Sequence, residues 1–195
     1  VWIDKPITAN EADAAALAAL AKKHRAPICG GSSLVHTDEI KRLSAYVKEN
    51  RADVLGGHVT APVNSENDYG GFWFYSQHLV QMITAVFGID VNSVTAKREN
   101  NSVRAVYRYE DFCVTAFFGT GYTASVYKSG YDAVSCNIHL GDDYFLPELN
   151  DFYQMIKTGR GIADFREFIA PVILIGATKR AFEENRETAV TIPEV

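Results

Sequence analysis

The sequence lacks the features that define several common classes of protein. Its three cysteines, Cys29, Cys113 and Cys136, lack the close spacing that metal and redox motifs require. No apolar run approaches the roughly 18 residues of a membrane-spanning helix, and no cluster of Lys and Arg offers a surface for phosphate groups. The 195 residues carry a net charge of -5. We therefore expect free thiols, a cytoplasmic location, and neither a nucleic-acid nor a membrane partner.

The sequence also lacks a loop that would bind nucleotide phosphates. Residues 119–124, Gly-Thr-Gly-Tyr-Thr-Ala, match the glycine pattern of a dinucleotide loop. That loop must lead into a helix whose N-terminus receives the pyrophosphate. Residues 123–127 instead alternate and are β-branched or aromatic, which predicts a strand. We interpret residues 119–124 as a hairpin turn. No Walker loop, zinc-binding histidine pair or Gly-x-Ser-x-Gly motif is present.

What the sequence does contain is an alternation of strands and helices in its first 50 residues. The chain begins without Met in an apolar segment, and Thr8 and Glu11 have the spacing of a capping box. The predicted order is a strand at residues 1–3, a helix at 8–24, a strand at 27–31 and a helix at 37–50. This order predicts parallel strands joined by crossover helices. Because an open parallel sheet needs neighbours, we interpret residues 1–53 as the remnant of a larger domain.

The rest of the chain predicts a mostly antiparallel sheet with helices. A strand at 54–63 and a helix from about Ser76 to Phe87 come first. Segments of period-two alternation follow, joined by short turns, which predicts a meander; they are 94–98, 103–109, 113–118, 123–127 and 133–140. Helices at 147–158 and 165–185 and a strand at 190–192 end the chain. The predicted fold class is therefore α/β (α+β).

One face of this open sheet is expected to be covered by helices. In residues 103–109, Val103, Ala105 and Tyr107 share one face, whereas Arg104 and Arg108 lie on the other. An antiparallel sheet commonly buries one face and leaves the other accessible. We expect the mixed, accessible face to bind a second copy of this chain and form a homo-oligomer.

Asp4-Lys5-Pro6 follows the first predicted strand, and ligands bind at the carboxyl ends of strands in open parallel sheets. A lysine there can hold a hydroxyl or a cofactor ribose, and its charge favours an alkoxide formed during hydride transfer. Pro6 would fix the turn and makes a cis Lys5-Pro6 bond accessible. Taken alone, the tripeptide fits a solvated turn better than a ligand site.

His78 lies in the first turn of the helix predicted to begin near Ser76. The positive end of the helix dipole disfavours an imidazolium, so a neutral His78 could exchange a proton with a substrate hydroxyl. A capping or core histidine is the alternative. The nearby aromatic residues Tyr69, Trp73 and Tyr75 fit a core or an interface. Beside a histidine they also fit the apolar wall of a small-molecule pocket.

Together these residues resemble the Gfo/Idh/MocA family of NAD(P)-dependent oxidoreductases, which includes glucose-fructose oxidoreductase and inositol dehydrogenase. The resemblance rests on Asp4-Lys5-Pro6, where the family has Glu-Lys-Pro, on the helix at 8–24, and on Gly70–His78 followed by an apolar helix and Gly88. It implies a C-terminal part that lacks most of the N-terminal Rossmann domain. Residues 1–53 would be a remnant of that domain, and residues 54–195 a C-terminal α/β substrate-binding and oligomerisation domain.

The resemblance also implies a function and its residues. The parent protein would move a hydride between NAD or NADP and a sugar, cyclitol or related hydroxylated substrate. Lys5 and His78 would be catalytic, Asp4, Lys5 and Pro6 would bind the cofactor, and no metal is implied. Tyr69, Trp73 and Tyr75 would bind the substrate. The chain alone would be inactive and bind no cofactor tightly, because the phosphate loop is not encoded in it.

Two departures from the family pattern leave a second hypothesis open. Many members have an Asp four residues before the histidine, where this chain has Phe74, and another three residues after it, where this chain has Gln81. Polarisation of His78 must then differ, and Tyr75 is a candidate substitute. The alternative is a non-catalytic small-molecule-binding or assembly module with the same fold.

Overall fold

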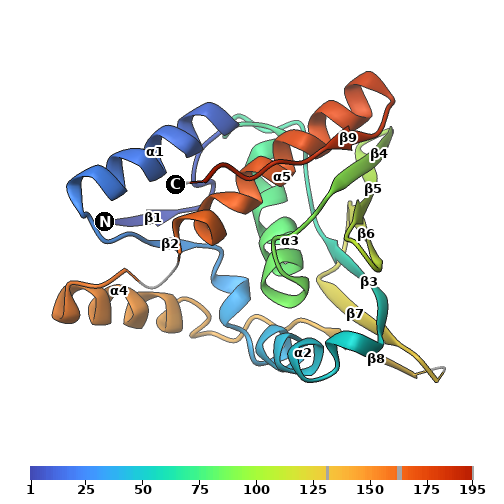
Figure 1. Cartoon of the computed structure of the whole chain (residues 1–195), viewed down its shortest axis with the longest axis horizontal. Coiled ribbons are helices and arrows are strands. Elements are labelled where there is room, and N and C mark those ends of the chain that lie inside the picture. Colours follow the sequence, from blue (N-terminus) through green and yellow to red (C-terminus); the bar gives the residue numbers. More distant parts are fainter. Residues whose placement is uncertain (131, 162–163, 195) are drawn as a thin grey trace.

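Residues 1–31 form a small parallel α/β unit in the computed structural model, which describes residues 1–130, 132–161 and 164–194. Strands β1 (Trp2–Asp4) and β2 (Cys29–Gly31) pair in parallel, with Ile3 opposite Gly30. Helix α1 (Glu11–His24) connects them and covers one face, while α4 (Leu146–Thr158) lies along the other side (Figure 1). The predicted parallel crossover is confirmed.

Seven strands form the second sheet, in the order β8-β7-β3-β6-β5-β4-β9. Every pairing is antiparallel except that of β3 with β6. The strands are β3 (Val54–Ala61), β4 (Ser93–Glu99), β5 (Ser102–Arg108), β6 (Cys113–Phe118), β7 (Thr123–Lys128), β8 (Asp132–Asn137) and β9 (Thr188–Ala189). The fold is therefore α/β with a mostly antiparallel sheet, as the sequence predicts.

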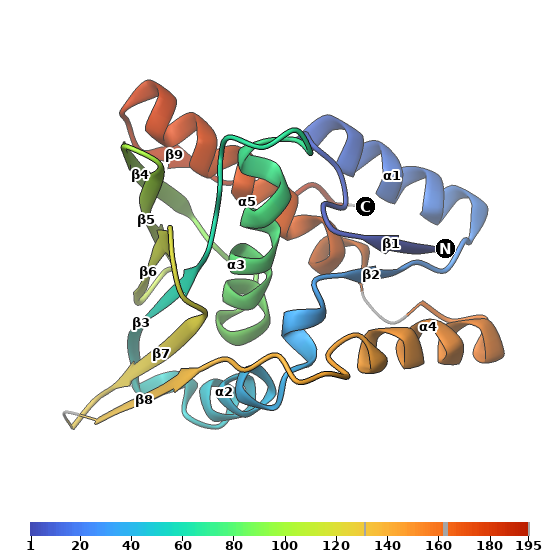
Figure 2. The same ribbon diagram turned by 180° about the vertical axis from the view of Figure 1, so that it is seen from behind.

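Helices cover one face of this sheet. Helices α2 (Asp38–Glu49), α3 (Phe72–Phe87) and α5 (Phe165–Glu184) lie on the same side of it, as Figures 1 and 2 show from opposite directions. Two short 3-10 turns, Ser33–His36 and Arg51–Asp53, flank α2. Among the described residues, no helix is long and apolar enough to cross a membrane.

The core has two parts that meet at α5. The larger part fills the space between the seven-stranded sheet and α2, α3 and α5, and the smaller part lies between α1 and the start of α5. Residues 168–178 of α5 are all buried, because both of its sides are covered. Trp73 packs against both parts. This shared packing holds the β1–β2 unit against α3.

Several local predictions are corrected by the structure. The side chain that caps α1 is Asn10, whose Oδ1 accepts from Asp13 N, while the Thr8 hydroxyl donates to Asn10 O. The last strand is Thr188–Ala189 rather than 190–192. Helix α3 begins at Phe72, four residues before the predicted start at Ser76.

The predicted meander is interrupted. Strands β4, β5 and β6 do pair in sequence, but β3 lies between β6 and β7. Residues 119–122 therefore form a connection across β3 and are no hairpin turn. The interpretation that this glycine pattern is not a dinucleotide loop stands, because it leads into strand β7.

Candidate functional site

Lys5 emerges from the carboxyl end of β1 and is held against two aromatic rings. Its Nζ lies 3.5 Å from the ring centroid of Phe74 and 4.6 Å from that of Tyr75. A cation over an aromatic face is attracted by the negative face of the ring. Burial lowers the pKa of Lys5, and the Asp4 carboxylate opposes that shift. The Lys5-Pro6 bond is cis.

His78 lies in the second turn of α3 and faces Ser32. Its Nδ1 is 2.7 Å from Ser32 Oγ, and Ser32 Oγ also accepts a hydrogen bond from Leu34 N at 3.3 Å. The ring of Tyr122 stands edge-on to the imidazole, with centroids 6.5 Å apart. Ser32 directly follows β2, so the contact between Ser32 and His78 joins the parallel strand pair to α3.

The imidazole of His78 is strongly biased toward its neutral form. Burial lowers the pKa of His78, and the positive charge of Lys5 adds to the shift, which brings the pKa to about 4. Loss of hydration destabilises the charged ring, and a nearby cation does the same. The predicted neutrality is therefore correct, but its predicted cause is wrong. Because α3 starts at Phe72, His78 is not in the first turn, where the helix dipole acts.

Gln81 fixes the position of Ser32. Its Oε1 accepts hydrogen bonds from Ser32 N and from Gln77 Nε2, both at 2.9 Å. A Cβ added to Gly31, which has φ +102°, would lie 2.5 Å from Gln81 Nε2. Only glycine lets the backbone of β2 approach this side chain so closely. Gln81 thus stands where the family pattern has a carboxylate, and it orders the serine that contacts His78.

The predicted substrate-binding residues are not all in one place. Tyr69 is 72% exposed and its ring lies 5.4 Å from that of Phe74, so Tyr69, Phe74 and Tyr75 form a continuous aromatic group beside Lys5. Trp73 is half-buried between the two parts of the core. Asp4 is exposed and Pro6 half-buried at the same turn as Lys5. The roles of these residues remain predictions.

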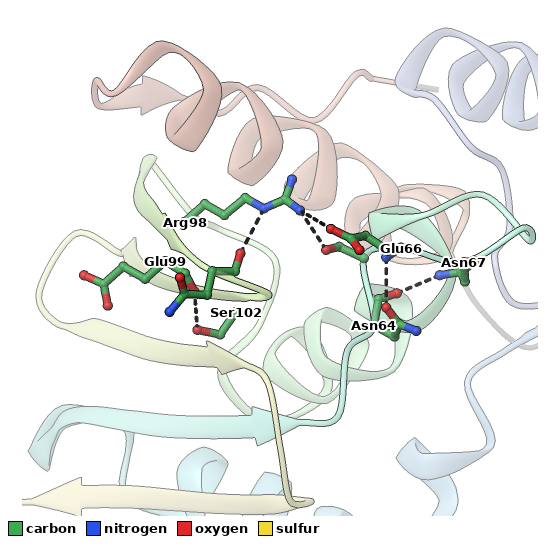
Figure 3. Close-up of polar contacts among 8 residues, drawn as sticks. Asn64, Glu66, Asn67, Arg98, Glu99 and Ser102 are labelled. Carbon is green, nitrogen blue, oxygen red and sulfur yellow. Dashed lines mark hydrogen bonds and ion pairs between the residues drawn. The ribbon is translucent and has the colours of Figure 1, made fainter.

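The loop that carries Tyr69 is tied to the β4–β5 hairpin by Arg98 (Figure 3). Arg98 Nη2 donates to Ser65 Oγ at 3.1 Å and pairs with Glu66 at 3.8 Å, while its Nε donates to Asn100 O. Within the loop, Glu66 N donates to Asn64 Oδ1, and the Asn67 amide donates to Asn64 O. These bonds position the segment that leads into α3.

Sequence reasoning missed Ser32 and the contact between Phe74 and Lys5. In the sequence, Phe74 stands out only because it occupies a position where many family members have an Asp. Nothing in the pattern indicates that its ring contacts an ammonium group. The signal for Ser32 was its place after Gly30-Gly31 at a strand end, where polar residues gather at ligand sites. We call the group formed by Lys5, Ser32, Phe74, Tyr75, His78 and Gln81 the Lys5–His78 site.

The Lys5–His78 site can stabilise negative charge and accept or release a proton. It joins a cation, a neutral imidazole and an aromatic wall. Within the described part of the chain, no group of three or more His, Cys, Asp or Glu side chains could hold a metal ion. The arrangement therefore suits chemistry at a hydroxyl or carbonyl group of a small molecule.

The Asp4-Lys5-Pro6 turn ends a parallel strand, and ligands bind at the carboxyl ends of strands in open parallel sheets. A pyrophosphate needs a glycine-rich turn at a helix N-terminus. The glycine pattern at 119–124 leads into strand β7 instead, so it does not meet that requirement.

Solved structures share this fold, although no protein-family model and no curated protein matches the sequence. Scyllo-inositol dehydrogenase from Lactobacillus casei, solved with NAD(H) and scyllo-inositol, matches with a TM-score of 0.79 and 14% identity over 97% of this chain and 72% of its own. Myo-inositol 2-dehydrogenase from Lactobacillus plantarum matches with a TM-score of 0.78 and 14% identity over 98% and 73%.

A third structure extends the comparison to aldoses. Aldose-aldose oxidoreductase from Caulobacter crescentus, complexed with glycerol, matches with a TM-score of 0.79 and 13% identity over 97% of this chain and 72% of its own. Identities this low establish the fold and leave the activity open. The chain has the fold of Gfo/Idh/MocA-type inositol and sugar dehydrogenases and spans nearly three quarters of their length.

Proposed function

We propose that this chain is the substrate-binding portion of an NAD(P)-dependent oxidoreductase that acts on a sugar, cyclitol or related hydroxylated molecule. The observation that carries the proposal is the pairing of a desolvated Lys5 with a neutral His78 beside an aromatic wall. The bound dinucleotide would supply or accept the hydride. Residues 1–53 would contribute to the cofactor side and residues 54–195 to the substrate side.

His78 is proposed as the group that exchanges a proton with the substrate hydroxyl. To accept a proton at Nε2, the neutral ring must carry its hydrogen on Nδ1 and donate it to Ser32 Oγ, 2.7 Å away. The serine oxygen has two acceptor positions, and Leu34 N uses one of them. Ser32 can therefore hold the required tautomer in place of the missing carboxylate.

Lys5 is proposed as the group that stabilises negative charge on the substrate oxygen. Its ammonium is partly desolvated, and a charge in such surroundings interacts more strongly than one in water. The faces of Phe74 and Tyr75 hold it without neutralising it. Asp4, Lys5 and Pro6 are proposed to contact the cofactor, and Tyr69, Trp73 and Tyr75 the substrate.

Variants of Lys5 and His78 test the proposal in the protein produced from its full reading frame. NAD(P)-dependent oxidation is measured across a panel of cyclitols and sugars. We expect His78→Ala to lower kcat by roughly 10²–10⁴-fold, and Lys5→Ala by about 10²-fold or more. His139→Ala is the control, because the His139 side chain is 79% exposed and pairs with Glu39 on the surface. If both variants match the wild type, the catalytic assignment is wrong.

A non-catalytic small-molecule-binding module is the second candidate. The observation that favours it is the occupation of the two family carboxylate positions by Phe74 and Gln81. The same panel distinguishes the two candidates. The second function is supported if calorimetry shows that the protein binds a cyclitol, while no member of the panel allows it to reduce NAD or NADP.

We also propose that the accessible face of the seven-stranded sheet joins copies of this chain. His58, Thr115, Val106 and Phe117 line a shallow hollow there, and the Arg104 guanidinium lies 5.1 Å from the Phe117 ring centroid. We expect Val106→Glu to dissociate the oligomer in sedimentation experiments, while Lys157→Glu on α4 leaves it intact. A wild-type protein that remains monomeric at high concentration would refute this assembly.

The compartment proposed for this function is the cytoplasm. Cys29, Cys113 and Cys136 are all free thiols, and a reducing environment preserves them in that state. Mass spectrometry of the protein isolated under alkylating conditions should find all three alkylated.

A further inference from the structure

A cavity lies beside the Lys5–His78 site and differs from that site in character. It has a volume of about 200 Å³ and is enclosed by β2, the 3-10 turn after it, α3, α4 and the start of α5. Of the residues that form the Lys5–His78 site, only Gln81 lines it. The proposed hydride-transfer function makes no use of this space.

Glu148 is the unusual residue in the wall of this cavity. The side chain comes from the buried side of α4, and the residue is only 1% exposed. The indole of Trp2 donates to Oε1 at 3.1 Å, whereas Oε2 has no hydrogen-bond partner among the described residues. A buried carboxyl oxygen without a partner costs free energy, so its presence in a cavity wall indicates a missing donor.

The other charged groups around the cavity have the same sign as an ionised Glu148. Asp151 and Glu167 also line it, and no described Lys or Arg does. The His36 imidazole approaches Asp151 at 3.6 Å, and burial lowers the pKa of His36, which favours its neutral form. The lining therefore attracts cations and repels anions.

The remaining walls are apolar, which limits the kind of cation. Val35, Ala85, Ile89 and Phe168 supply hydrocarbon surface. No described cluster of side chains suits a metal ion, and a metal would gain nothing from hydrocarbon walls. A volume of about 200 Å³ is below the roughly 300–1,000 Å³ typical of drug-sized ligands. The fitting ligand is small, with a charged donor at one end and an apolar body.

We propose that this cavity, the Glu148 cavity, binds a small organic cation of the primary ammonium type. The ammonium group donates to Glu148 Oε2, with Asp151 and Glu167 at the entrance, and the alkyl part contacts Val35, Ile89 and Phe168. This site is independent of the proposed oxidoreductase function. Because Gln81 borders both, an occupied cavity also contacts the residue that positions Ser32.

Trp2 gives a direct readout of occupancy. The protein contains only two tryptophans, so an ¹⁵N-labelled sample shows two indole N–H resonances, and Trp73→Phe identifies that of Trp2. We expect n-propylammonium to shift the Trp2 resonance saturably at constant ionic strength. Propan-1-ol has the same number of heavy atoms and no charge. It should bind roughly tenfold or more weakly, because it brings no positive charge to pair with the Glu148 carboxylate, and a hydrogen bond between two ionised groups is the stronger kind.

Glu148→Gln is the decisive variant, because it keeps an acceptor for the Trp2 indole and removes the charge. We expect it to weaken n-propylammonium binding by roughly tenfold or more, and Asp151→Asn to weaken it less. Glu183→Gln is the matched control, since Glu183 pairs with Lys179 on an exposed part of α5. The proposal is overturned if the cation causes no saturable shift up to about 100 mM, if propan-1-ol binds as well, or if Glu148→Gln leaves binding unchanged.

Discussion

The Lys5–His78 site and the Glu148 cavity both hold ionisable groups away from water, and opposite charges dominate them. In the first, Lys5 rests on aromatic faces and lowers the pKa of His78. In the second, the pKa of Glu148 is raised to about 7, chiefly by burial; the Trp2 hydrogen bond opposes the shift, and the carboxylates of Asp4 and Asp151 add to it. Burial favours the neutral form of each group, and the neighbours decide whether the region attracts an anion or a cation.

The largest expected effect comes from the strand that separates the two regions. Gly30 lines the Glu148 cavity and pairs with Ile3 of β1. It has φ +123°, and an added Cβ would lie 2.0 Å from the Ile3 carbonyl oxygen. We expect Gly30→Ala to lower the free energy of unfolding by about 4 kcal/mol or more, since backbone strain and a clash with backbone add together.

A matched control separates the clash from the strain. Gly70 has φ +112°, and its added Cβ would meet no atom within 4 Å. Denaturant unfolding should show a loss of about 1–2 kcal/mol for Gly70→Ala. Equal losses for the two variants would mean that the close β1–β2 contact does not hold the two regions together.

The next prediction tests the Lys5–His78 site through the pH dependence of the free energy of unfolding. The folded-state pKa of His78, about 4, is below the usual histidine value of 6.5. A base with a lowered pKa contributes stability that is full above pH 6.5 and is lost as the pH falls through 4. We expect the advantage of wild type over His78→Asn to fall by about 3 kcal/mol between pH 7 and pH 3.5. His139→Asn, on the surface, should show no such trend.

Glu148 should give the opposite trend with pH. Its folded-state pKa, about 7, is above the usual glutamate value of 4.5. An acid with a raised pKa contributes stability below pH 4.5, which is lost as the pH rises through 7. Thermal unfolding should therefore show Glu148→Gln gaining about 2 kcal/mol relative to wild type between pH 5 and pH 8. If the stabilities of the wild type and of Glu148→Gln change with pH in the same way, the Glu148 carboxyl is in contact with water.

A smaller effect is expected at Ser32. Ser32→Ala removes the partner of His78 Nδ1 and the acceptor for Leu34 N. The free energy of unfolding should fall by about 1 kcal/mol. The ¹⁵N shifts of the imidazole should show a mixture of tautomers in place of one. Unchanged ¹⁵N shifts would mean that Ser32 does not set the tautomer of His78. In either case the binding of n-propylammonium in the Glu148 cavity should be unaffected.

Most of the elements could be predicted from the sequence, because their signals are local. The alternation in β5 and β6 reproduces the observed burial, and the boundaries of β6 are as predicted. The position of β3 between β6 and β7 could not be predicted. Consecutive alternating strands with short connections favour a meander, and the alternation does not encode the parallel pairing of β3 with β6, which joins segments about 57 residues apart.

The start of α3 shows why the site was only partly predictable. Four aromatic residues, 72–75, have low helix propensity, and the Gly71 position offers no capping side chain. Tertiary packing overrides that preference, since Phe72 is buried against Phe118 and Phe182. The titratable residues Lys5 and His78 could be named from the sequence. Their partners Ser32 and Phe74, and the burial of Glu148, depend on contacts between distant segments.

The titration of His78 tests the central claim most directly. The claim is that a buried imidazole stays neutral beside the charged Lys5. The ring resonances of His78, assigned with His78→Asn, are followed by NMR from pH 3.5 to 8 in the wild type and in Lys5→Met. The account predicts a pKa of about 4 in the wild type, and a higher value, still below 6.5, in Lys5→Met, because burial remains when the charge is removed. A wild-type imidazole that titrates near 6.5, or one that does not respond to Lys5→Met, would contradict it.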